Sequence, residues 1–375
     1  MRLGYSHWGF LGDGVTDTPD GGRSWRSTML TTLAADHRLI LLQPNRDQLE
    51  AGHDVPGPYS WDSGLPDLDA LFVEWRWPLP GRNDTPCGSP GHTCDLHRQQ
   101  ELLNHYTLRL GVPTLLWDLD KTLADDDPLR THPAVRVLDP ATHPAPGALT
   151  MRVPVFDEVL DGADPEHLVG GSRIWSLCYV GNQYGRDEHF DRFFAPPARR
   201  HPHQVIGKWT DTARWPHVHF AGRQGFAASQ RLHARSVTTV LLAPPRYAAT
   251  GSMSQRLPEA VLAGCLPLGP ADIAGIRDFL PPELVVRDGK AADLVISNLD
   301  AFGQNNRAEV LAQCLDRLGP FRASRQRAVV QAAFADIAGG RAADARTDIN
   351  AMHRSVLRTL SDLASDPAGT DASPR

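Results

Sequence analysis

Residues 251–270 have the sequence Gly-Ser-Met-Ser-Gln-Arg-Leu-Pro-Glu-Ala-Val-Leu-Ala-Gly-Cys-Leu-Pro-Leu-Gly-Pro, and they predict the fold of the chain better than any other stretch. A small, flexible turn at 251–254 follows an apolar segment at 237–243 that predicts a strand. A short helix is predicted from about Gln255 to Ala263, and Gly264 is placed to close it. Residues 265–268 then predict the next buried strand. This order is typical of an α/β domain.

The predicted helix carries two charged side chains at its start. A strand, a glycine-bearing loop and a helix N-terminus together form a common anion site, because unpaired N–H groups and the positive end of the helix dipole point at the ligand. Arg256 and Glu259 lie three residues apart and so share one face of the first turns. They offer a cation for a phosphate and a carboxylate for sugar hydroxyls. A helix packed on a sheet with a surface ion pair fits the same pattern.

The segment resembles the donor-site signature of the group 1 (retaining, GT-B) glycosyltransferases. In that family a helix with the pattern E-A-x-A-x-G-x-P-V places its glutamate on the ribose of a nucleotide sugar, and the corresponding residues here, in order, are Glu259, Ala260, Ala263, Gly264 and Pro267. The arginine three residues before the glutamate is similar to the spore-maturation-type branch of the superfamily. The fuller motif has a second acidic residue eight positions before the glutamate, near the transferred sugar, and this chain has Gly251 there. The identity of the sugar is therefore left open.

Length and composition fit a globular protein of two domains. The chain has 375 residues, of which 41% are hydrophobic and 22% charged. Its formal net charge of −6 argues against a nucleic-acid partner, because a protein needs clustered Lys and Arg to neutralise the phosphates. No signal-peptide pattern or long apolar run occurs, and the five cysteines are scattered. We therefore expect a cytoplasmic protein with reduced thiols and no membrane span.

The amino-terminal segment predicts the opening of a nucleotide-type parallel domain. A strand is expected at 2–6, then a loop that ends in a double glycine, a helix, and a second strand at 37–42. The order resembles the family's amino-terminal pattern, which implies that Gly21 and Gly22 let the backbone approach the donor phosphate and the acceptor. A plain loop is an equal explanation of the two glycines alone. His7, at the end of the first strand, is the natural base if the reaction inverts the sugar.

Another strand is predicted at 69–77. In open parallel sheets ligands sit beyond the carboxyl ends of the strands, so Glu74 and Arg76 are candidates for binding the acceptor. Trp75 or Trp77 could stack on a sugar or an aromatic acceptor, and aromatic packing under a loop is the alternative.

The segment Asp118-x-Asp120-x-Thr122 follows an apolar strand and resembles the nucleophile loop of haloacid-dehalogenase-type phosphatases. In those enzymes the first aspartate attacks phosphorus and the second handles the leaving-group proton, with magnesium between them. That motif normally opens its domain, whereas over a hundred residues precede it here. In a GT-B frame the strand end faces the cleft, so Asp118 and Asp120 become candidates for binding the acceptor hydroxyl.

A turn-rich segment contains Cys87, His92, Cys94 and His97. Their spacing, Cys-x4-His-x-Cys-x2-His, fits none of the usual paired arrangements of zinc ligands. The sequence therefore predicts no metal site, and whether these four residues bind a metal stays open.

A second sheet is predicted to start at 175–180. The family's first turn in this domain carries cations for the diphosphate, and the resemblance implies that role for Arg186 after the glycine turn at Gly181. A cation near a helix start is unfavourable by itself, which favours an anionic ligand there. In the family the later loop, here with Gly222, Arg223 and Phe226, lies against the nucleobase.

The resemblance implies an α/β fold of the GT-B type, with two Rossmann-like doubly wound domains facing each other across a cleft. We expect an acceptor-side domain at 1–165, a nucleotide-sugar domain at 172–345, a helix at 346–364 that crosses back to the first domain, and a disordered tail at 365–375. The implied activity is the transfer of a sugar from a UDP, GDP or dTDP sugar to a hydroxyl of a small molecule or glycan. The reaction is expected to be retaining, metal-independent and without a cofactor.

The implied donor site consists of Gly21, Gly22, Gly181, Arg186, Gly222, Arg223, Phe226, Ser252, Arg256 and Glu259. The residues expected to act in catalysis are Arg186, Arg256 and Asp120, with His7 as the base of an inverting route. Two alternatives are a phosphatase built on Asp118 and Asp120, and a non-catalytic protein that binds sugar nucleotides, which the glycine at position 251 would permit. The oligomeric state is left open.

Overall fold

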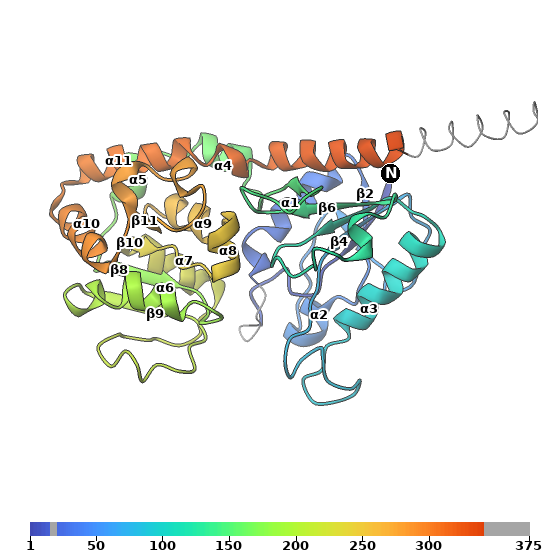
Figure 1. The fold of residues 1–375 in the computed structure, drawn as a ribbon, viewed down its shortest axis with the longest axis horizontal. Helices are drawn as coiled ribbons and strands as arrows, with labels where there is room; N and C mark the ends of the chain where they lie inside the picture. The colour runs from blue at the N-terminus through green and yellow to red at the C-terminus, as the bar shows by residue number, and fades with distance from the viewer. Residues whose placement is uncertain (16–20, 341–375) are drawn as a thin grey trace, which may run out of the picture.

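The structure is a computed structural model that describes residues 1–15 and 21–340. It contains two parallel sheets, each covered by helices, in two domains that lie side by side (Figure 1). The first sheet has the order β3-β2-β1-β4-β5-β6-β7. Its strands are β1 (Arg2–Ser6), β2 (Arg38–Leu41), β3 (Tyr59–Trp61), β4 (Ala70–Glu74), β5 (Thr114–Trp117), β6 (Val135–Asp139) and β7 (Leu149–Thr150).

The second sheet has the order β12-β11-β10-β8-β9. Its strands are β8 (Trp175–Val180), β9 (His203–Ile206), β10 (Ser236–Val240), β11 (Leu266–Pro270) and β12 (Val285–Val286). Strands such as β4 and β10 are buried along their whole length, because helices cover both faces of a parallel sheet. In both sheets the strand order reverses beside the first strand of the domain, and such a switch point opens a crevice beyond the carboxyl ends of the strands.

The helices of the first domain are α1 (Arg26–Ala34), α2 (Arg46–Ala51) and α3 (Asp95–Leu102), and α3 continues as a π-helical segment at Leu103–Arg109. The short helices α4 (Asp157–Asp161) and α5 (Pro165–Val169) join the two sheets. The second domain adds α6 (Asp187–His189), α7 (Phe226–Ala234), α8 (Pro245–Thr250), α9 (Arg256–Leu262), α10 (Gly289–Ala301) and α11 (Gln304–Asp316). No helix within 1–15 and 21–340 has the length and apolarity needed to cross a membrane.

A last described helix, at 323–340, follows the second domain in the chain and runs along the first domain (Figure 1). Its side chains contact the first domain: Gln326 accepts a hydrogen bond from the Arg152 N–H at 2.8 Å, and Arg327 pairs with Asp36. The helix therefore ties the end of the second domain to the first. Residues 346–364, where the sequence predicts the returning helix, and the tail at 365–375 lie outside the described residues.

Candidate functional site

A pocket lies between the two domains, at the carboxyl ends of β8 and β9. The first domain contributes Gly21 and Arg23, and the second contributes the turns after these strands and the first turns of α7 and α9. Six residues of the expected donor site line it together: Gly21, Gly181, Arg223, Phe226, Arg256 and Glu259. The structure thus gathers residues that are more than two hundred positions apart in the sequence.

Glu259 lies on α9 and is only 8% exposed. Its Oε2 atom accepts a hydrogen bond from Arg256 Nη1 at 2.6 Å, across one turn of the helix. Its Oε1 atom is buried and has no hydrogen-bond partner among the described residues. An unpaired buried carboxylate oxygen is costly, and a ligand hydroxyl at the pocket would satisfy it.

A second, narrower pocket adjoins the first at Arg256 and lies at the carboxyl end of β10. Arg186 and Ser252, both expected in the donor site, line this part. The Arg186 guanidinium donates to the backbone carbonyls of Asn182, Tyr184 and Leu242 at 3.0–3.3 Å. No carboxylate in the described part of the chain pairs with Arg186, so its charge is available to an anion.

The pocket beside Arg256 also contains His233, which sequence reasoning did not single out. Burial, and then the charge of Arg256, lower the pKa of His233 to about 3. Both ring nitrogens lack a hydrogen-bond partner among the described residues. The ring is therefore neutral at pH 7 and leaves the cationic character of this pocket to Arg186 and Arg256. His233 lies in an ordinary amphipathic helix, so nothing in the sequence around it indicated a place in the pocket.

The double glycine lets its loop pack closely against two neighbours, the start of α9 in the second domain and the Arg26 side chain in the first. A Cβ atom on Gly21 would lie 2.4 Å from Gln255 Nε2, and a Cβ on Gly22 would lie 2.2 Å from Arg26 Nη2. Gln255 Nε2 also donates a hydrogen bond to the Gly21 carbonyl at 3.4 Å. The glycines thus let the loop approach the start of α9, with Gly21 on the pocket wall and Gly22 against Arg26.

The loop that precedes α7 is joined to the first domain by Asp13. The Asp13 carboxylate accepts hydrogen bonds from the Phe226 N–H at 2.9 Å and the Ala227 N–H at 3.5 Å, and it lies 3.6 Å from Arg23 Nη1. Phe226 and Arg223 line the pocket, and burial lowers the pKa of the Arg223 guanidinium. Gly222 lies in an exposed turn of positive φ (72°) next to Arg223.

The resemblance leads us to expect an acidic residue at position 251. The structure explains why a glycine is found there instead. Gly251 ends α8 with φ 66°, in the left-handed region. A Cβ atom there would lie 2.2 Å from the Ala274 carbonyl oxygen and 3.0 Å from Thr142 of the first domain. The Gly251 carbonyl accepts hydrogen bonds from the Thr142 N–H and hydroxyl at 3.2 and 3.1 Å. This backbone leaves no room for any side chain, acidic or not.

We therefore expect Gly251→Ala to destabilise the protein more than Gly52→Ala. Gly52 also has a positive φ (73°), but nothing lies within 4 Å of its added Cβ, so its variant measures only the left-handed strain of about 1–2 kcal/mol. Gly251→Ala adds the clash with Ala274, which typically costs a further 1–3 kcal/mol or so. Urea unfolding of both variants measures the difference. Equal losses would show that position 251 tolerates a side chain.

Glu74, expected to bind the acceptor, lies in a buried ionic network. Its Oε1 atom accepts hydrogen bonds from Tyr5 Oη at 2.7 Å and Arg26 Nε at 2.8 Å, and its Oε2 atom accepts from Arg26 Nη2 at 2.7 Å and Arg76 Nη2 at 2.8 Å. Four bonds saturate the carboxylate, and its side chain is fully buried. The Arg76 guanidinium also lies over the Trp8 ring, 4.8 Å from its centroid.

His7 is also buried at the end of β1, 4% exposed. The His7 ring contacts the Gln43 side chain, with 2.5 Å between His7 Nδ1 and Gln43 Nε2. The centroid of the Trp61 ring lies 6.2 Å from that of His7. Both contacts come from one side of the switch point, because Gln43 follows β2 and Trp61 lies on β3.

The two aspartates of the 118–122 loop have different partners. Asp118 is 3% exposed and accepts hydrogen bonds from the N–H groups of Thr122 and Leu123 at 2.8 and 3.1 Å, and burial raises its pKa. It therefore shapes its own loop rather than facing a cleft. Asp120 reaches the other domain: its Oδ1 accepts from Tyr247 Oη at 2.5 Å and its Oδ2 from Trp77 Nε1 at 3.1 Å.

Solved structures with a similar fold are glycosyltransferases. T4 phage BGT in complex with UDP and Mn²⁺ has a TM-score of 0.57 and 10% identity, over 89% of this chain and 99% of that one. AviGT4, a glycosyltransferase involved in avilamycin A biosynthesis, has a TM-score of 0.54 and 14% identity, over 90% and 98%. HepE of Anabaena with UDP and glucose has a TM-score of 0.51 and 10% identity, over 88% and 99%. No protein-family model and no curated protein matches the sequence.

These likenesses, together with the two parallel sheets, confirm the predicted GT-B fold. At 9–14% identity they establish the architecture only. What the site does follows from its residues.

Proposed function

We propose that this protein is a glycosyltransferase that moves a sugar from a nucleoside-diphosphate sugar to a hydroxyl acceptor. The observation that carries the proposal is the buried, unpaired Oε1 of Glu259 beside the cations Arg256 and Arg186, in a pocket between two Rossmann-like domains. The carboxylate can accept hydrogen bonds from the ribose hydroxyls of such a donor. The neighbouring cations can bind its diphosphate.

In the proposed reaction the bond between the sugar C1 and the phosphate oxygen breaks, and C1 forms a bond to the acceptor oxygen. Negative charge develops on the leaving diphosphate, and Arg186 and Arg256 neutralise it from fixed positions, where preorganised donors give the largest rate benefit. Arg186 is preorganised because three backbone carbonyls already hold its guanidinium. Ser252, which lines the same pocket, offers its hydroxyl to the phosphates, whereas its N–H already donates to the Tyr247 carbonyl at 3.0 Å.

We propose the retaining outcome, in which the leaving phosphate itself accepts the proton of the acceptor hydroxyl. No protein base is then required, and Arg186 and Arg256 take the place of a metal ion at the diphosphate. This assignment follows the resemblance of the α9 helix to the retaining, spore-maturation-type enzymes. In an inverting reaction His7 would be the base, and its ring would need to release Gln43 to reach an acceptor.

The first domain, at about 1–165, is proposed to bind the acceptor and the second, from about 172, the donor. A β-glucosyltransferase of similar fold (TM-score 0.56) is a DNA-modifying enzyme. Here the net charge of −6 favours a small-molecule or glycan acceptor over DNA, because a DNA groove needs clustered cations. Asp120, at the domain boundary, is proposed to contact the acceptor hydroxyl.

Binding of a nucleoside diphosphate without added metal tests the proposal. Thermal unfolding is measured with UDP, GDP and dTDP, each with and without EDTA, and with EDTA alone as the baseline. A ligand at 100 times its Kd stabilises the native state by about 2.7 kcal/mol, and we expect one of the three to do so in both conditions. Inorganic pyrophosphate, which lacks the ribose, is the control and should stabilise less. If none of the three stabilises the protein, the proposal fails.

Replacing Asp120 by asparagine separates the transferase from a phosphatase. A phosphatase of the D-x-D-x-T type would lose all activity, because its general acid is gone. In the transferase we expect weaker use of the acceptor and nearly unchanged nucleotide binding, since Asp120 itself lines neither pocket and asparagine keeps an oxygen that can accept from Tyr247 Oη. Steady-state kinetics, nucleotide binding and phosphatase activity with p-nitrophenyl phosphate are measured on both forms. Loss of nucleotide binding in the variant would contradict the assignment of the donor to the second domain.

A further inference from the structure

We propose that Cys87, His92, Cys94 and His97 bind one zinc ion as a structural site in the loop between β4 and α3. Their ligand atoms, two sulfurs and two imidazole nitrogens, all lie within 4.8 Å of one another. The site belongs to the first domain and is separate from the pocket described above. It goes beyond the proposed function and does not depend on it.

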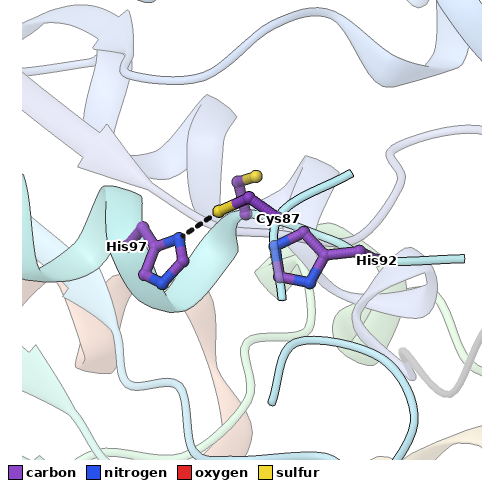
Figure 2. A group of neighbouring side chains, drawn as sticks. Cys87, His92 and His97 are labelled. Atoms are coloured by element: carbon purple, nitrogen blue, oxygen red, sulfur yellow. Dashed lines mark hydrogen bonds between the residues drawn. The ribbon is translucent and has the colours of Figure 1, made fainter. Parts of the chain in front are cut away.

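The distances are close to those of a tetrahedral centre. With Zn–S bonds of about 2.3 Å and Zn–N bonds of about 2.0–2.1 Å, ligand atoms at tetrahedral angles lie roughly 3.3–3.8 Å apart. Cys87 Sγ is already 3.1 Å from His97 Nδ1, and the His92 and His97 ring centroids are 5.8 Å apart. Figure 2 shows the rings of His92 and His97 on either side of the Cys87 sulfur in this view. Small rotations of exposed side chains would complete the tetrahedron.

The hydrogen bonds of Thr85 prepare His92 as a ligand. The Thr85 hydroxyl donates its one hydrogen to the Arg82 carbonyl at 3.1 Å, so toward His92 it can only accept. Its contact of 3.0 Å with His92 Nδ1 therefore places the imidazole hydrogen on Nδ1 and the lone pair on Nε2. Nε2 is buried and has no partner among the described residues. A metal-bound histidine is commonly fixed in this way through its other nitrogen.

The chain around the cluster is built as a turn-rich loop rather than as a packed unit. Gly88 and Gly91 adopt φ values of 83° and 74°, with nothing within 4 Å of an added Cβ, and they fold the chain so that Cys87 returns toward α3. Cys94 is the N-cap of α3, and His97 lies in its first turn. A metal bound by these residues would close the loop onto the helix, which stabilises a segment that has little apolar core of its own.

The same loop supports the domain boundary. Asn83, 3% exposed, donates to the Trp77 carbonyl at 3.1 Å and to Asp95 Oδ2 at 2.9 Å. Trp77 in turn donates to Asp120, which contacts Tyr247 of the second domain. Zinc in the loop would thus stabilise the segment after β4 that carries Trp77, and with it the contact between the two domains.

The donor set selects the metal. Two thiolates and two imidazoles with no water position form a closed site of the kind that binds structural Zn²⁺, and the soft sulfur ligands disfavour Mg²⁺ and Ca²⁺. The competing structure is a Cys87–Cys94 disulfide, which would remove both thiolates.

The test measures zinc in the full-length protein, produced without a histidine tag in zinc-supplemented medium and desalted before elemental analysis. We expect about one zinc per chain, and a loss to background in the Cys87→Ser/Cys94→Ser double variant. His97→Ala should also lose zinc, whereas His53→Ala, an equally exposed histidine outside the cluster, should retain it. Zinc at background in the parent protein, or equal zinc in all variants, would overturn the proposal.

A second measurement keeps the proposal testable if a variant fails to fold. Apoprotein prepared with a chelator under reducing conditions is titrated with Co²⁺, and we expect the sulfur-to-cobalt charge-transfer band and the intense visible bands of tetrahedral cobalt. Thr85→Val should bind zinc about 10–100-fold more weakly, because His92 loses the group that fixes its tautomer. An octahedral cobalt spectrum would refute the site. Intact-mass analysis with and without reductant would detect the disulfide, which would refute it as well.

Discussion

Replacing Glu74 by alanine is expected to destabilise the protein by about 3–5 kcal/mol, the usual cost of removing one partner from a buried ion pair. Glu74 lies between Arg26 and Arg76 and binds both, and the Arg26 side chain is fully buried. Without the carboxylate, two like charges would face each other, and the Tyr5 hydroxyl would lose its acceptor. Glu74→Gln, which keeps the shape, should lose less stability but remain clearly destabilised.

Glu101→Ala is the matched control, because Glu101 forms a surface pair with Arg98 and is 53% exposed in its side chain. Such exposed pairs contribute about 0–1 kcal/mol. Urea unfolding at pH 7 compares the variants. If Glu74→Ala unfolds like the control but raises the KM for the acceptor, then Glu74 is a ligand of the acceptor and the network is unimportant for stability.

The sequence predicted the helix and strand of the proposed donor site well, because the relevant signals are local. Helix α9 was expected at about 255–263 and is found at Arg256–Leu262, and the next strand was expected at 265–268 and is found at Leu266–Pro270. A helix start, a glycine at its end and an apolar run are all readable within twenty residues. The pairing of Arg256 with Glu259 follows from helix geometry alone.

The surroundings of the residues proposed for the acceptor were harder to predict, because strand ends do not reveal which way a side chain faces. Glu74 and Asp118 do come at the carboxyl ends of β4 and β5. Glu74 is covered by Arg26, which is 48 residues earlier in the chain, and Asp118 turns back onto its own loop. A long-range partner of that kind leaves no pattern in a single sequence.

The cysteine and histidine cluster shows the same difference between sequence distance and spatial distance. The spacing from Cys87 to His97 suggested no zinc motif, because the usual motifs place paired ligands on one tight turn or one helix. Here two glycines with positive φ reverse the chain between the ligands, and the four donor atoms meet from a loop and a helix start. The sequence shows that the chain can turn at these two glycines, but it does not show in which direction the chain turns.

The donor site makes a prediction that distinguishes binding from turnover. Glu259→Ala should reduce the affinity for the nucleoside diphosphate by tens-fold or more, because each charge-assisted hydrogen bond to a ribose hydroxyl contributes about 1.5–3 kcal/mol. The fold should survive, since Arg256 is 28% exposed and stays hydrated after losing its partner. Arg256→Ala should instead lower kcat more than affinity, if its charge meets the leaving phosphate chiefly in the transition state.

Calorimetry with the nucleoside diphosphate and steady-state kinetics measure the two variants. Glu50→Ala is the control, because Glu50 forms a comparable helical pair with Arg46 on the surface of the first domain, and it should change neither quantity. A double variant, Arg256→Ala/Glu259→Ala, shows whether the two residues act together, since the losses of coupled residues do not add. Small and equal effects in both single variants would mean that α9 is only a scaffold, and that the unpaired Oε1 of Glu259 has no ligand to meet.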